Sequence, residues 1–137
     1  MKTYTEHVTL QTDNHREFTN LTPRVKAAVE KSEVTDGIAV IATLHSNSAI
    51  LVTDDDPKLL EDIDAWLEKL APAGDEYKTP LSRESRGGIY LQGLALGGDA
   101  TVTVVNGKLE LGAWRQVFFV ELDGGRPKRL VIKVMGI

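Results

Sequence analysis

Residues 38–45 read Ile38-Ala39-Val40-Ile41-Ala42-Thr43-Leu44-His45. Apolar side chains occupy both alternating faces of this run, a pattern typical of a strand covered on its two sides. The run ends at His45, where a rigid strand end can hold an imidazole in a fixed direction. We therefore expect a buried central strand that carries a candidate functional group at its end.

Other strand patterns lie on both sides of this run. Asn106-Gly107 separates two short apolar stretches and predicts a hairpin, because Asn-Gly fits the two positive-φ positions of a type I′ turn. The segment Tyr4 to Leu10 alternates and is rich in Thr, which favours a strand near a sheet edge. Further strands are predicted over residues 49–53, 116–122 and 128–135.

Two helices are predicted between these strands. Thr22 is expected to cap the first, with Pro23 at its first position, and the helix runs to about Ser32 before a turn at Asp36-Gly37. Asp56-Pro57 predicts the start of the second in the same way. The second helix has a continuous apolar stripe: Leu59, Leu60, Ile63, Trp66, Leu67 and Leu70. Residues 73–88 read as a long loop, and residues 89–96 fit a short helix or a strand.

The element order β-α-β-β-α, followed mainly by strands, predicts the α+β class. We expect a single domain over residues 1–137, with mostly antiparallel β-sheet layers and the two main helices packed on one side. The other side would pack on a second sheet layer or on another subunit.

Composition narrows the function classes. The chain has 137 residues, is 42% hydrophobic and 26% charged, and has no cysteine. The absence of cysteine excludes disulfides, thiolate zinc sites and a cysteine nucleophile. The net charge of -4 argues against nucleic acid as a partner. No run of about 20 apolar residues suggests a membrane span, and the polar start predicts a cytoplasmic location.

His45 is the strongest single candidate for chemistry, since no standard nucleotide-binding or hydrolase motif occurs. An imidazole at a strand end can act as a base, an acid or a ligand. It can equally cap the strand end by a hydrogen bond, and the sequence leaves both interpretations open.

Two charged groups of residues also have alternative interpretations. The acidic set could hold a divalent cation or simply cap the second helix: Asp54, Asp55, Asp56, Glu61 and Asp62. Asp54 would lie near His45 if the two strands pair, and Asp62 is expected to be partly buried. Near the C-terminus, the segments 114–116 and 123–129 favour anion recognition, or a charged hairpin tip with Trp114 packed in the core.

Several of these segments occur together in the order of a known family. They are His45-Ser46-Asn47-Ser48-Ala49-Ile50, Asp54, Leu59-Leu60-Glu61-Asp62, Asn106-Gly107-Lys108-Leu109, Leu111-Gly112-Ala113-Trp114-Arg115-Gln116 and Asp123-Gly124-Gly125-Arg126. From about Leu21 to Gly136, the chain resembles the YjbQ-like family, often labelled secondary thiamine-phosphate synthase.

The resemblance implies a compact α+β fold, assembly as a homotrimer, and a pocket where histidines gather around an anion or a divalent metal. It also implies a weak reaction that joins a pyrimidine diphosphate to a thiazole phosphate. On this basis His45 and Asp54 are the predicted catalytic residues. The predicted ligand-binding residues are Ser46, Asn47, Tyr90, Gln116 and Arg126.

The chain departs from the family pattern at several of these positions. Ser46-Asn47 replaces Thr-Thr, and Thr53-Asp54 replaces Asn-Glu. Thr79 and Tyr90 stand where family histidines are expected, so one of three histidines remains. Zinc and iron sites need three or four protein ligands, so no metal is predicted.

Two functions therefore stay open. One is a divergent thiamine-phosphate synthase; the other is a non-catalytic oligomer that binds a small anionic ligand. Both rest on the expectation that His45 and Arg126 face one hollow.

Overall fold

The protein's computed structural model describes residues 1–72, 77–78 and 87–137. Its elements in these ranges are, in chain order, β1 (Lys2–Gln11), β2 (Glu17–Asn20), α1 (Thr22–Ser32), β3 (Asp36–Thr43), β4 (Ser48–Asp54), α2 (Pro57–Leu70), α3 (Gly87–Leu96), β5 (Asp99–Val105), β6 (Lys108–Leu109), β7 (Arg115–Glu121) and β8 (Pro127–Gly136).

The larger of two sheets has five strands in the order β1-β8-β3-β5-β6. Its strand pairs are antiparallel, with β3 between β8 and β5 and with β1 at an edge. The predictions of a central strand after residue 37 and an edge strand at the N-terminus are confirmed. Ala39 and Ile41 of β3 are completely buried, so they face the core of the molecule.

A second, three-stranded sheet has the order β2-β7-β4 and packs on the inner face of the first. Strand β7 is buried on both sides because its residues alternate between two hydrophobic clusters. Val117 and Phe119 pack between the sheets, whereas Phe118 and Val120 pack on the opposite face. The second sheet layer lies on the same side of the large sheet as the helices, not on the opposite side where the sequence allowed it, and its strand β2 was not predicted.

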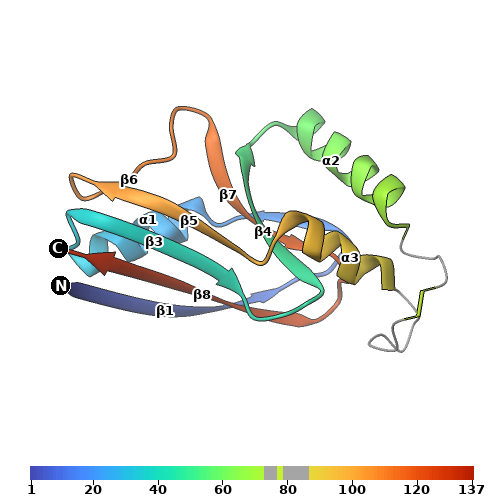
Figure 1. The fold of residues 1–137 in the computed structure, drawn as a ribbon, viewed down its shortest axis with the longest axis horizontal. Coiled ribbons are helices and arrows are strands. Elements are labelled where there is room, and N and C mark those ends of the chain that lie inside the picture. The colour runs from blue at the N-terminus through green and yellow to red at the C-terminus, as the bar shows by residue number, and fades with distance from the viewer. Residues whose placement is uncertain (73–76, 79–86) are drawn as a thin grey trace.

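The helices are divided between the two clusters (Figure 1). Helix α1 inserts Val25 and Val29 into the core between the sheets, whereas Leu67 of α2 and Ile89 of α3 cover the other face of the small sheet. The α+β class with mostly antiparallel layers is confirmed. Both main helices lie on one side of the large sheet, as predicted, with α1 between the two sheets and α2 beyond the small sheet.

Of the two helix caps predicted from the sequence, one is confirmed. The Asp56 side chain accepts a hydrogen bond from Lys58 N at 2.9 Å, so the predicted cap of α2 is confirmed. The predicted Thr22 cap is wrong. Leu21 is the N-cap, and the Thr22 hydroxyl instead accepts from Val117 N at 2.9 Å, because the helix start is pinned to β7.

The turn after α1 also comes earlier than predicted. The helix closes at Glu33, which has a left-handed φ of 59°, whereas Asp36 and Gly37 already belong to β3.

The hairpin prediction at Asn106-Gly107 is confirmed, with φ values of 53° and 74°. The sequence left helix and strand open for residues 89–96. They belong to helix α3, which begins two residues earlier at Gly87. Most of the long loop predicted over residues 73–88 lies outside the described residues.

Candidate functional site

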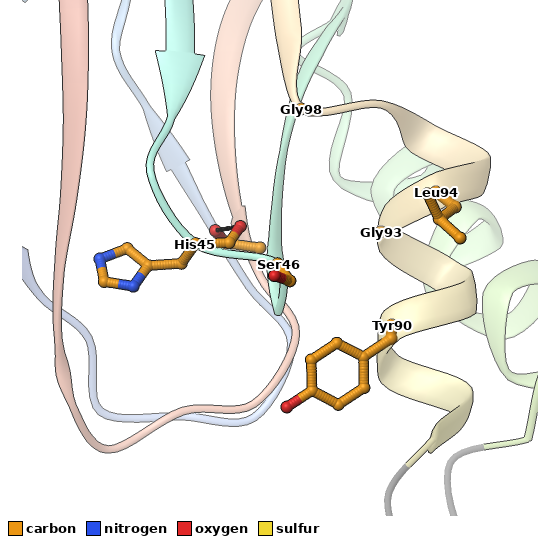
Figure 2. A pocket seen from close by; sticks show the side chains of 7 residues that line it. His45, Ser46, Tyr90, Gly93, Leu94 and Gly98 are labelled. Atoms are coloured by element: carbon orange, nitrogen blue, oxygen red, sulfur yellow. Dashed lines mark hydrogen bonds between the residues drawn. The ribbon is translucent and has the colours of Figure 1, made fainter. Parts of the chain in front are cut away.

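A cavity of about 390 Å³ lies where the β3–β4 loop meets α3 (Figure 2). It is lined by His45, Ser46, Ser48, Tyr90, Gly93, Leu94 and Gly98. The fold therefore brings together three of the residues predicted from the sequence: His45, Ser46 and Tyr90. Concave sites of this size are typical places for a small molecule to bind.

Hydrogen bonds within the β3–β4 loop fix its shape. The Thr43 hydroxyl lies 2.5 Å from the Ser48 hydroxyl and accepts from His45 N at 3.2 Å. The Ser48 hydroxyl donates to the His45 carbonyl at 3.1 Å. These hydrogen bonds tie the backbone at His45 to the end of β3 and the start of β4, which fixes the direction of the imidazole.

The imidazole of His45 is engaged by the backbone of β8. Its Nε2 accepts a hydrogen bond from Arg129 N at 3.0 Å, and Figure 2 shows the ring directed away from Tyr90. A nitrogen that accepts from an N–H group carries no proton, so the neutral ring carries its proton on Nδ1. In this state neither ring nitrogen has a free lone pair, so the ring acts as a hydrogen-bond donor.

The surroundings keep the imidazole neutral. Burial lowers the pKa of His45 below its usual value, and the positive charges of Lys128 and Arg129 lower it further, against a smaller opposing effect of Glu121. The interpretation of His45 as a strand-end cap is the one that this geometry matches.

A buried ion pair lies beside this histidine. Glu121 Oε2 accepts from Lys128 Nζ at 2.7 Å and from Asp123 N at 3.0 Å, and Oε1 accepts from the Thr12 hydroxyl at 2.5 Å. Burial raises the pKa of Glu121, but the hydrogen bonds from Lys128, Thr12 and the backbone outweigh it, so the pKa lies below its usual value. The Lys128 ammonium is therefore already neutralised within the chain.

The sequence analysis missed this pair, although a signal was present. Glu121 is the one charged residue in the apolar run 117–122, and Lys128 has the same strand phase as the buried Leu130 and Ile132. A charged side chain in a buried phase needs a partner.

Two further predicted residues lie beside the β3–β4 loop. Asn47 Nδ2 donates to Asp123 Oδ2 at 3.3 Å, and the Asn47 carbonyl accepts from Leu122 N at 3.2 Å. These bonds join the loop to the turn that carries Arg126. Arg126 is exposed, its carbonyl accepts from the Thr12 hydroxyl at 3.2 Å, and it does not line the cavity. This cavity therefore contains His45 without Arg126, and it is not the shared hollow that the sequence analysis expected.

Asp54 and Gln116 lie at the other end of the small sheet. In the β4–β7 register, Ser48 pairs with Glu121, whereas Thr53 pairs with Gln116 and Asp54 with Arg115. Six residues of strand separate Ser48 from Asp54, which corresponds to about 20 Å. The condition for Asp54 to lie near His45, that β3 pairs with β4, is not met, because the two strands belong to different sheets. Asp54 is thus not brought to His45 within one chain.

The remaining charged and aromatic candidates lie on the surface. Trp114 is 77% exposed, so the alternative that packed it in the core is wrong. Asp62, expected to be partly buried, is also exposed. Gln116 Oε1 accepts from Asn20 Nδ2 at 3.1 Å, and Asn20 Nδ2 also lies 3.3 Å from Asp55 Oδ2.

The residues of this site do not fit the metal that the family resemblance implies. Tyr90 occupies the position of one expected histidine, and the Nε2 lone pair of His45 is already used by Arg129 N. Across the described part of the chain, no three His, Asp or Glu side chains are grouped closely enough to bind a metal ion. Thr79, the position of another expected histidine, lies outside the described residues.

Among residues 1–72, 77–78 and 87–137, no helix combines the length and the apolar content of a membrane crossing.

Comparison with known proteins identifies the family. The family model described as "UPF0047 protein YjbQ-like" matches residues 6–137. The chain belongs to the YjbQ family. A UPF0047 protein of Methanothermobacter thermautotrophicus is 35% identical over 136 residues, which cover 99% of this chain and 94% of the relative. A UPF0047 protein of Archaeoglobus fulgidus is 34% identical over 128 residues, covering 93% of this chain and 98% of the relative.

Solved structures of YjbQ relatives share the whole fold. A protein of unknown function from Sulfolobus solfataricus has a TM-score of 0.94 and 29% identity, with 99% of each chain covered. An uncharacterized conserved protein from Clostridium acetobutylicum has a TM-score of 0.88 and 31% identity, covering 95% of this chain and 99% of the other. The resemblance found in the sequence is confirmed. The two solved relatives are described as of unknown function and as uncharacterized, so they assign no activity.

Proposed function

We propose that this YjbQ protein binds a small anionic ligand in the cavity beside His45 and does not catalyse a reaction there. The observation that carries this proposal is the hydrogen bond from Arg129 N to His45 Nε2. It leaves the imidazole as a donor and removes the lone pair that a general base or a metal ligand needs.

The lining supports an anion as the ligand. Ser46 and Tyr90 carry hydroxyl groups, and no carboxylate occurs among the described residues that line the cavity. The Arg129 side chain is exposed and its charge acts on His45, whereas the Lys128 ammonium is paired with Glu121. Hydroxyl donors beside an exposed cation favour a phosphate or carboxylate group.

The second candidate is the thiamine-phosphate-forming reaction that the resemblance implies. Here the thiazole nitrogen bonds to the pyrimidine methylene carbon, the bond from that carbon to the diphosphate oxygen breaks, and pyrophosphate leaves with the electron pair. Its support is the pair of exposed cations, Arg126 and Arg129, next to the β3–β4 loop, because a departing pyrophosphate needs positive charge.

One experiment separates the two. Titration calorimetry of the purified protein with pyrophosphate and with thiamine phosphate measures binding, and coupling of the two precursors is assayed in parallel. We expect binding of at least one of these anions, about five-fold weaker in Ser46→Ala or Tyr90→Phe because each variant loses one hydrogen bond. We expect no more thiamine phosphate than a His45→Ala control forms.

Each outcome decides between the candidates. Product above the His45→Ala level overturns the non-catalytic proposal and supports the synthase. Affinities that are unchanged in both cavity variants, or the absence of binding for both anions, overturn the cavity as the anion site. His7→Gln is the matched control for replacing a histidine, since His7 is exposed on β1.

We also propose that the protein is cytoplasmic and that it assembles as a homotrimer; the resemblance implies the trimer. Support comes from the outer face of the large sheet. Ile38, Val40 and Ala42 of β3 lie there beside Val131, Lys133 and Met135 of β8, each half-buried. No described helix covers this face. A half-buried sheet face that combines apolar side chains with a charged one is a suitable surface for another subunit.

A further inference from the structure

Arg16 is a buried arginine in the connection between β1 and β2. Its side chain is 3% exposed, and its backbone has a left-handed φ of 57°. A non-glycine residue in this conformation is strained, and it persists only where surrounding contacts hold it there. The contacts that hold Arg16 all lead to α2 and α3.

The guanidinium contacts both helices at once. Nη1 donates to the Asp64 carbonyl at 2.7 Å and to Asp64 Oδ1 at 2.8 Å, and Nη2 donates to Glu68 Oε2 at 3.1 Å. Nη2 also donates to Gln92 Oε1 on α3 at 2.9 Å. Nε is buried without a hydrogen-bond partner among the described residues, so the side chain is oriented entirely by the two terminal nitrogens.

Gln92 continues the connection from α3 back to α2. It is completely buried, and its Nε2 donates to the Ala71 carbonyl at 2.8 Å and to the Leu67 carbonyl at 3.3 Å. Both carbonyls lie at the end of α2, where the Leu67 carbonyl also accepts from Ala71 N at 3.1 Å. The β1–β2 connection, α3 and the end of α2 thus form one hydrogen-bonded chain.

Apolar packing alone holds α2 weakly. Leu67 is its one fully buried residue, whereas Trp66 and Leu70 of the apolar stripe are 50% and 53% exposed. Helix α3 is the cavity wall, since Tyr90, Gly93 and Leu94 lie on either side of Gln92 in sequence and line the cavity. The polar chain through Gln92 therefore ends at the wall of the candidate site.

We propose that Arg16 is a positioning residue for this cavity: through Gln92 it holds α3, and with it the cavity wall, against α2 and the small sheet. The inference concerns the shape of the wall and does not depend on which ligand the cavity takes.

Hydrogen exchange measured peptide by peptide tests this proposal on the whole protein. Arg16→Met removes four hydrogen bonds, and Arg16→Lys keeps the charge but cannot reach all four acceptors. We expect exchange in α2 and α3 to be about 10- to 100-fold faster in Arg16→Met, as expected for losing bonds to charged groups. Strands β3 and β8 should be unchanged, and Arg16→Lys should lie in between.

A second variant tests the route through Gln92. Gln92→Met leaves Arg16 in contact with Asp64 and Glu68 but breaks the bonds to the end of α2. It should speed exchange in α3 and in the last turn of α2 while the middle of α2 stays protected. Trp66 is the sole tryptophan in a Trp114→Phe background. In that background, acrylamide should quench the fluorescence of Trp66 more strongly when Arg16→Met is added.

Lys31→Met is the matched control, because its ion pair with Glu6 is exposed and 3.7 Å long. Faster exchange confined to α2 would overturn the proposal, since the wall would then not depend on Arg16. Uniformly faster exchange over β3 and β8 would also overturn it, and so would unchanged α3 protection in Gln92→Met.

Discussion

His45 is held in one protonation state by groups distant in sequence. Arg129 supplies a backbone N–H to Nε2, and burial, followed by the positive charge of Lys128, lowers the pKa of the imidazole. Protonation would replace the accepted hydrogen bond by a repulsion between two donors. The same residue therefore links stability to pH.

We predict that stability falls as the pH drops below about 6.5, the usual pKa of histidine. Because the pKa of His45 is lowered in the folded state, the unfolded chain binds more protons between that lowered pKa and 6.5, so stability rises with pH across this window. His45→Gln keeps an acceptor for Arg129 N but does not titrate, and should flatten this slope. Urea unfolding at a series of pH values measures it.

The wild type is measured over the same pH series, and the difference between the two slopes isolates the contribution of His45. A slope that persists in His45→Gln would contradict the prediction. Glu121 acts in a different window: its lowered pKa gives stability that is present above about 4.5 and is lost as the pH falls through the lower, folded value.

At the scale of elements, the pairing of β3 with β8 depends on a close backbone approach at Gly37. A Cβ placed there would lie 2.1 Å from the Met135 carbonyl oxygen and 2.8 Å from Gly136 Cα. Only glycine allows this approach, which joins the central strand to the strand that carries Lys128 and Arg129.

Gly37→Ala should therefore destabilise the protein by about 1–3 kcal/mol, the usual cost of forcing a methyl group into a packed region, or more because the neighbour is backbone. Urea unfolding at pH 7 measures the change. Gly98→Ala is the matched control, because its Cβ would meet only the Thr43 methyl group at 3.7 Å. Equal losses in the two variants would show that the β3–β8 approach is not the cause.

For the whole molecule, the unusual feature is that no described helix or strand covers the outer side of the large sheet. Two hydrophobic clusters account for the inner face of this sheet and for both faces of the small one. The outer face has half-buried Ile38, Val40 and Val131 at its centre, together with Lys133, which pairs with Val40. Strand and helix content alone cannot reveal such a face, because it follows from how the layers stack.

We predict a solution mass of three chains, and a shift toward the mass of one chain in Val131→Lys, because a charge would be buried in the proposed interface. Light scattering coupled to size exclusion measures both. Ala27→Lys, on the exposed side of α1, should leave the mass unchanged. A trimer that survives Val131→Lys would place the interface elsewhere, and a monomeric wild type would remove the assembly proposal.

Much of the local structure was predictable because its causes are local. Asn106-Gly107 makes its hairpin through its own backbone preferences, and Asp56-Pro57 starts a helix within three residues. Thr22 failed as a cap because a distant backbone group, Val117 N, bonds its hydroxyl. For the candidate site, the sequence predicted His45, Ser46 and Tyr90 as site residues. It did not predict which groups their side chains contact.

The amino-acid order by itself determined the class of the fold, the central position of β3 and the family, since each depends on patterns within short segments. Only the tertiary structure decided that β3 and β4 enter different sheets, that Arg129 occupies the lone pair of His45, and that Arg16 reaches α3. Those outcomes depend on strand register and layer stacking, which place groups up to 84 residues apart within one hydrogen bond.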